Sequence, residues 1–63
     1  MQRMPVLTLM LSTQQAWAFA QFLKRVSLAD YQALASNVDE AYLMLEAGEA
    51  IRADLRLAGY EPR

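Results

Sequence analysis

The sequence contains neither cysteine nor histidine. Their absence excludes disulfide bonds, zinc sites built from thiolates or imidazoles, and nucleophiles that a histidine activates. Only two glycines are present, so no glycine-rich loop of the kind that cradles phosphate groups can be formed. Six basic residues against seven acidic ones leave a formal net charge of -1, without the positive excess that favours nucleic-acid binding. We therefore expect a protein without catalytic activity, cofactor or metal, for which a nucleic acid is not the expected partner.

The length and composition indicate a small globular protein. The chain has 63 residues, of which 56% are hydrophobic and 21% are charged, and this length suits a single domain over residues 1–63. The longest N-terminal apolar stretch, Val6–Leu11, is far shorter than the roughly 20 residues that a membrane-spanning helix needs. No cleavage site of a signal peptide follows it. We expect a cytoplasmic protein that does not associate with a membrane.

The N-terminal segment has the pattern of a β-strand. Pro5 favours extended geometry in the residue before it, and Val6–Leu11 is short, partly β-branched and followed by polar residues. Alternate residues of a strand point to opposite faces. Leu7, Leu9 and Leu11 form the more apolar face, which we expect to point toward the core.

Two helices are predicted next. Ser12 and Gln15 have the spacing of a capping box, with Thr13 as the alternative cap, and apolar residues then recur at helical spacing as far as Val26. With Phe22 included, the apolar arc covers about half of the helix surface, so this helix should be covered on more than one side. Ser27 begins a shorter helix in the same way, which ends near Ser36.

The third predicted helix is the longest and carries two apolar lines. It starts at Asn37 or Asp39 and runs to about Ala58, where Gly59 suits a left-handed C-terminal cap. Its first apolar line has spacings of three and four and consists of Ala41, Met44, Gly48, Ile51, Leu55 and Ala58. The second repeats every seven residues and consists of Leu43, Ala50 and Leu57. A mid-helix glycine costs about 1 kcal/mol relative to alanine, so Gly48 indicates close approach of another helix.

The predicted fold is therefore mostly α, with one N-terminal strand followed by three helices (βααα). A lone strand has no hydrogen-bonding partner in its own chain, and an apolar edge invites pairing. The simplest remedy is a two-fold homodimer in which the strands pair antiparallel. Its interface would consist of Val6, Leu7, Thr8, Leu9, Met10 and Leu11. The alternative is that residues 4–11 form an extended arm packed on the helices.

Several exposed positions are candidates for contact with another protein. Trp17 falls away from the main apolar stripe of its helix, and tryptophan is enriched at binding hot spots. The polar face of the third helix pairs Glu49 with Arg52 at a favourable spacing. The candidate contact residues are Trp17, Gln21 and Lys24 of the first helix, and Tyr42, Glu46, Glu49 and Arg52 of the third.

A DNA-binding function is the alternative from a different class. A strand followed by helices in a two-fold dimer is the arrangement of ribbon-helix-helix regulators, whose paired strands enter the major groove. The outward positions Val6, Thr8 and Met10 lack the side chains that read base edges, which weighs against this interpretation.

Two stretches carry a resemblance to known proteins: Ser12–Arg25, and the segment from Asp39–Tyr42 through Ala47–Glu49 to Ala58–Arg63. Together they resemble short, uncharacterised proteins carried on integrative elements and plasmids of proteobacteria. Such a context implies a small regulator or an inhibitor of host defence, as anti-CRISPR proteins are, which acts by occupying the surface of a partner. The leading hypothesis is accordingly a non-catalytic protein-interaction module whose partners are itself and a host protein complex.

Overall fold

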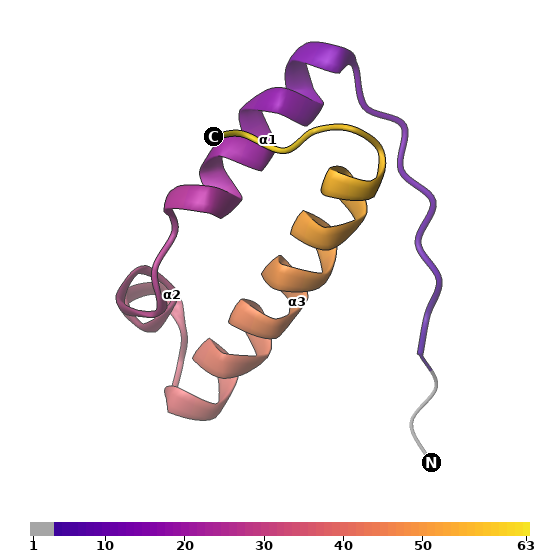
Figure 1. Ribbon diagram of the computed structural model, residues 1–63. Coiled ribbons are helices and arrows are strands. Elements are labelled where there is room, and N and C mark those ends of the chain that lie inside the picture. Colours follow the sequence, from indigo (N-terminus) through magenta and orange to yellow (C-terminus); the bar gives the residue numbers. More distant parts are fainter. Residues whose placement is uncertain (1–3) are drawn as a thin grey trace.

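The computed structural model describes residues 4–63, and over these residues it consists of three helices and no strand. The helices are α1 (Thr13–Arg25), α2 (Leu28–Leu34) and α3 (Val38–Leu57). α1 and α3 lie side by side and run in opposite directions, and the short α2 connects them at one end (Figure 1). Both α1 and α2 pack on α3, which is therefore the central element of the fold.

The predicted strand is wrong, and with it the βααα fold. Residues 4–11, which we call the N-terminal arm, are extended, but no backbone hydrogen bond joins them to another described residue. An alternating pattern becomes a strand only when a second segment satisfies its amide and carbonyl groups, and no described segment of the chain does so. Of the alternative, an extended arm packed on the helices, the extended shape is confirmed, but every residue of the arm is exposed, so close packing is not. The antiparallel pairing of strands proposed for a homodimer loses its basis.

Both predicted capping boxes are confirmed. At α1, the Ser12 hydroxyl accepts a hydrogen bond from the Gln15 amide at 3.0 Å, and the Gln15 side chain accepts one from the Ser12 amide at 2.9 Å. At α2, Ser27 and Asp30 make the same reciprocal pair. These bonds satisfy amide groups that a helix start leaves free, so each helix begins where its local sequence directs.

Both ends of α3 also follow from local sequence. Of its two candidate caps, Asn37 is the one used, since its side chain accepts a hydrogen bond from the Glu40 amide at 2.8 Å. Gly59 adopts a φ of 103°, in the left-handed region that favours glycine. The Tyr60 amide then donates to the Leu55 carbonyl at 2.8 Å, the pattern of a Schellman motif. This turn directs the C-terminal tail back across α1 (Figure 1).

The core is built from small side chains. The buried hydrophobic residues are Ala16, Ala20, Leu23, Ala41 and Leu55. Gly48 is also buried, and a Cβ there would overlap the Tyr31 hydroxyl and lie 3.5 Å from the Leu23 side chain, so the predicted close approach of another helix is confirmed. The first apolar line of α3 thus packs inside the protomer, except for Ala58 at its end, which is exposed. Its second line remains outside, with Leu43 64% and Leu57 85% exposed.

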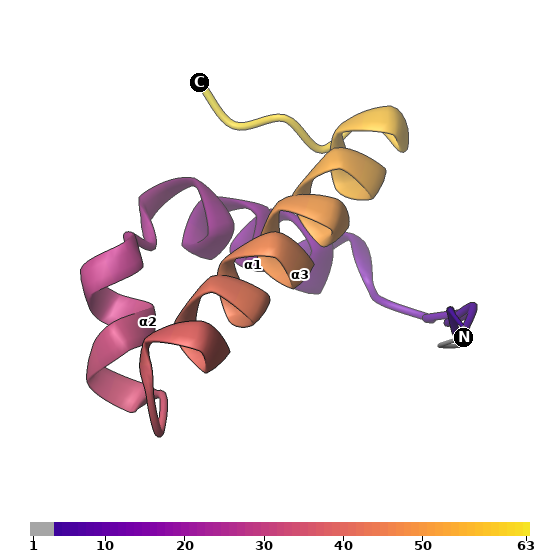
Figure 2. The same ribbon diagram turned by 90° about the horizontal axis from the view of Figure 1, so that it is seen from below.

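The molecule is thin and its chain ends diverge. Its extents are 33 × 29 × 15 Å, so the smallest dimension is little more than one helix diameter. The N-terminal arm and the C-terminal tail leave the helices on opposite sides (Figure 2). No helix within residues 4–63 has both the length and the apolar character needed to cross a membrane.

Candidate functional site

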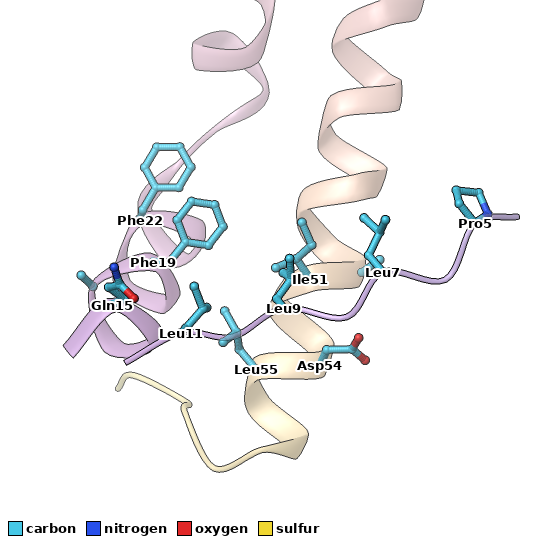
Figure 3. Close-up of a pocket in the computed structure, with 12 residues that line it drawn as sticks. Pro5, Leu7, Leu9, Leu11, Gln15, Phe19, Phe22, Ile51, Asp54 and Leu55 are labelled. Atoms are coloured by element: carbon cyan, nitrogen blue, oxygen red, sulfur yellow. The ribbon is translucent and has the colours of Figure 1, made fainter. Parts of the chain in front are cut away.

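A broad groove lies between the N-terminal arm, α1 and α3. It has a volume of about 900 Å³ and is lined almost entirely by apolar side chains. Figure 3 shows leucines of the arm, phenylalanines of α1 and aliphatic residues of α3 around it. The lining residues are Pro5, Leu7, Leu9, Leu11, Gln15, Ala18, Phe19, Phe22, Ala50, Ile51, Asp54 and Leu55.

The arm forms one wall of the groove through its alternating pattern. Leu7, Leu9 and Leu11 line the groove, whereas Val6 and Met10 are more than nine-tenths exposed. The side predicted to face the core is therefore the side that faces the helices. The six residues predicted to form a dimer interface, Val6–Leu11, are divided between two environments, as extended backbone requires.

Two phenylalanines of α1 form the opposite wall. Phe19 and Phe22 lie one turn apart, and their rings stack with centroids 5.4 Å apart and an interplanar angle of 22°. They are 42% and 49% exposed, because no residue that the structure describes covers them fully. The wide apolar arc predicted for this helix is explained: Ala16, Ala20 and Leu23 pack toward α3, and the phenylalanines face the groove.

The groove offers little polar chemistry. Gln15 and Asp54 are the polar residues among the described residues that line it. The Gln15 side-chain oxygen already accepts the Ser12 amide in the capping box, which leaves Asp54 as the one ionisable group. Within residues 4–63, no cluster of acidic residues has the arrangement of a metal site. The groove is thus suited to bury the apolar side chains or groups of a molecule that binds there.

A second, smaller hollow of about 530 Å³ lies beside the junction of α1 and α2 and is more polar. Gln21, Arg25, Asp30 and Tyr31 contribute to its lining. The Ser27 amide and then the Ser27 hydroxyl hold the pKa of Asp30 below its ordinary value of 3.8. Because the Asp30 carboxylate is used to cap α2, its structural role accounts for this shift.

The predicted contact residues of α1 lie outside the groove. Trp17 is 41% exposed and meets Tyr60 edge-on, with ring centroids 5.3 Å apart. Gln21 lines the smaller hollow and Lys24 is exposed. Five residues separate Trp17 from Phe22, which is about 140° around the helix at about 100° per residue. The Trp17 side of α1 is therefore distinct from its groove side.

The predicted contact residues of α3 lie on a polar side of that helix. Tyr42, Glu46 and Glu49 are exposed, and Arg52 is half-buried. Glu49 and Arg52 form the predicted ion pair at 3.9 Å. By helical rotation, Tyr42 and Glu49 fall nearly opposite Ile51, which lines the groove. Their part in binding stays a prediction.

The sequence alone did not distinguish the groove residues of the helices as a site. Phe19, Phe22, Ile51 and Leu55 all fall on apolar stripes, which a sequence alone assigns to a core. Two signals pointed beyond the core: the half-cylinder apolar arc of α1 and the second apolar line of α3. Each shows more apolar surface than one neighbouring helix can cover.

Neither a curated protein nor a solved structure matches the chain. A family model does match, and it covers the whole sequence, residues 1–63. The chain therefore belongs to DUF7706, a family of unknown function.

Proposed function

We propose that this protein is a non-catalytic protein-interaction module that binds another polypeptide through its apolar face. By apolar face we mean six groove-lining residues of the arm, α1 and α3 together with two leucines of the second apolar line of α3, which lie on the same side of that helix as Ala50. The groove-lining residues are Leu7, Leu9, Leu11, Phe19, Phe22 and Ala50, and the two leucines are Leu43 and Leu57.

The observation that supports the proposal is that small apolar side chains are buried whereas large apolar side chains are exposed. Within residues 4–63, three of the five buried hydrophobic residues are alanines, whereas Phe19, Phe22 and Leu43 are between 42% and 64% exposed. Burying a large apolar side chain contributes roughly 1.5–3 kcal/mol, so leaving several of them in water forgoes much of the free energy that could stabilise a small chain. Contiguous apolar surface of this kind marks an interaction site.

The chemistry of the face favours a protein over a nucleic acid. Its ionisable group is a carboxylate, Asp54, which repels phosphate. The paired strands that a ribbon-helix-helix regulator inserts into DNA have no counterpart in residues 4–63, so the DNA-binding alternative is no longer supported. The mobile-element context and the inhibitor hypothesis rest on the sequence resemblance, and neither is needed for binding through this face.

The proposal is tested by capture from cells that express a tagged chain together with an untagged copy, so that self-association is also detected. Phe22→Gln is the test variant. Val38→Gln is its matched control, because Val38 is an apolar residue of similar exposure, 57% against 49%, that does not line the groove. We expect a stoichiometric polypeptide with the native chain and with Val38→Gln, and its loss with Phe22→Gln. Equal retention by all three chains would contradict binding through the apolar face.

A further inference from the structure

The structure also indicates what covers the apolar face. On the basis of the proposed function, we propose that a second copy of this chain covers the apolar face. The two copies form a two-fold homodimer in which α3 packs antiparallel on α3 of the partner. The arm and α1 of each copy, which form the groove walls, then cover the contact between the two α3 helices from both sides.

The exposed area of the protomer has the size that such a dimer requires. The chain exposes 5563 Å², whereas a compact monomer of 7.1 kDa exposes about 4,100 Å². Its radius of gyration is 12.8 Å against about 11 Å for a compact chain of this length. An excess of about 1,500 Å² on each copy amounts to about 3,000 Å² for a pair, within the range of obligate homodimers.

The second apolar line of α3 supplies the seam. Leu43, Ala50 and Leu57 recur every seven residues, and Ala47 and Asp54 complete the alternation of four and three that helix–helix seams use. All five are exposed in the protomer, because the intramolecular contacts of α3 use its other line. One apolar line of α3 therefore packs within the protomer and the other remains exposed, so α3 can pack against a further helix.

Within this seam, the line of Leu43, Ala50 and Leu57 is self-complementary about its centre. A two-fold axis beside Ala50 sets each residue before it opposite the residue equally far beyond it in the partner. Leu43 and Leu57 both lie seven residues from Ala50, so each leucine meets the other across the axis. Ala47 and Ala50 at the centre let the helix backbones approach closely. One contact is unfavourable, since Asp54 lies opposite Glu46 of the partner at the rim.

Two features favour a second copy over a different partner. A core of three alanines and two leucines is small even for a 63-residue chain, so the face needs a permanent cover, and a second copy is always present where the chain is made. The face is also nearly free of charge, as obligate homodimer interfaces are, whereas transient interfaces are more polar.

The first test is the mass of the purified native chain by sedimentation equilibrium at micromolar concentration. We expect twice the 7.1 kDa of one chain. Phe22→Gln is expected to raise the dissociation constant by about tenfold or more, and Val38→Gln to leave it unchanged. Asp54→Asn is expected to lower it severalfold, because it removes the like-charge contact with Glu46 of the partner. A monomer mass for the native chain, or an assembly larger than two, overturns the proposal.

The second test locates the interface, and the natural absence of cysteine makes it simple. Ala50→Cys places one thiol on the predicted axis, and Arg56→Cys places its control about 120° away around the helix, at an exposed position. We expect Ala50→Cys to form a disulfide-linked dimer on oxidation and to be protected from alkylation at high protein concentration. Arg56→Cys should remain reactive at every concentration. Protection of Arg56→Cys instead would place the interface on the polar side of α3 and refute the assigned seam.

The two proposals fail in different ways. A monomeric native chain that still captures another polypeptide through Phe22 refutes the homodimer and supports the interaction module. A monomeric chain without any capture that depends on Phe22 refutes both.

Discussion

At the scale of single residues, Gly48 determines how closely α2 can approach α3. It lies at the centre of α3 beneath the Tyr31 ring, where a Cβ would overlap the Tyr31 hydroxyl. Alanine is favoured over glycine by about 1 kcal/mol in a helix interior. An added Cβ would, however, displace Tyr31 and with it α2. This helix is short and has no buried side chain that would hold it in place.

We predict that Gly48→Ala does not stabilise the native chain, because displacing Tyr31 offsets the gain in helix propensity. In a Tyr31→Phe background the overlapping oxygen is absent, and the same substitution should stabilise the protein by up to about 1 kcal/mol. Denaturant unfolding of the four chains of this double-mutant cycle measures the coupling. Equal effects of Gly48→Ala in the two backgrounds would show that the glycine is not required by Tyr31.

Asp30 confers a pH dependence on α2. Hydrogen bonds from Ser27 lower the pKa of the folded-state carboxyl below 3.8, so its ionised form stabilises the helix at neutral pH. This contribution is complete above the ordinary pKa and is lost as the pH falls through the lowered folded-state value. We predict that native chain and Asp30→Asn differ by a constant stability above that range and converge below it, as followed by circular dichroism.

At the scale of elements, local capping residues determine where the helices begin and where the last one ends. The structure of the N-terminal arm depends instead on whether a neighbouring segment pairs with it. Ser12, Ser27 and Asn37 satisfy the free amides at three helix starts, and Gly59 ends the last helix. The arm has the alternation of a strand without a described neighbour to pair with. The same local pattern therefore leads to different outcomes according to what lies beside it.

We predict that the amides of residues 6–11 exchange with solvent at nearly intrinsic rates, because no described group accepts a hydrogen bond from them. The central amides of α3 should exchange most slowly. Hydrogen exchange read by NMR resolves the two segments. Protection at alternate arm residues would show that the arm pairs with another strand in solution.

Gly59 ends α3 and positions the tail. Its φ of 103° is strained for any residue with a Cβ, although open space surrounds the site, so the cost of Gly59→Ala is conformational. We expect a loss of at least about 1 kcal/mol and an altered Trp17 fluorescence, because Tyr60 no longer meets the indole in the same way. Gly59→Asn should lose less, since asparagine tolerates the left-handed region better. Equal losses for the two variants would contradict this explanation.

At the scale of the whole molecule, the protomer has more apolar surface than its own helices can cover. The interior holds alanines and two leucines, and the large side chains lie on the apolar face. If two copies fold together, stability becomes a function of protein concentration.

We predict that the midpoint of thermal unfolding rises by about 5 °C for each tenfold increase in concentration of the native chain, from the entropy of unfolding of two such chains. The measurement is a dilution series followed by circular dichroism. A midpoint independent of concentration would indicate that the protomer is stable alone with its apolar face in water.

The sequence by itself determined the three helices, because capping boxes, helical periodicity and a C-terminal glycine are local signals that act within a few residues. It also determined that Gly48 meets another helix and that Glu49 pairs with Arg52. Only the tertiary structure decided whether the arm is a strand, since pairing depends on a distant neighbour. It alone decided which apolar residues are core, because periodicity shows that a side chain is apolar, whereas burial depends on whether a second surface lies against it.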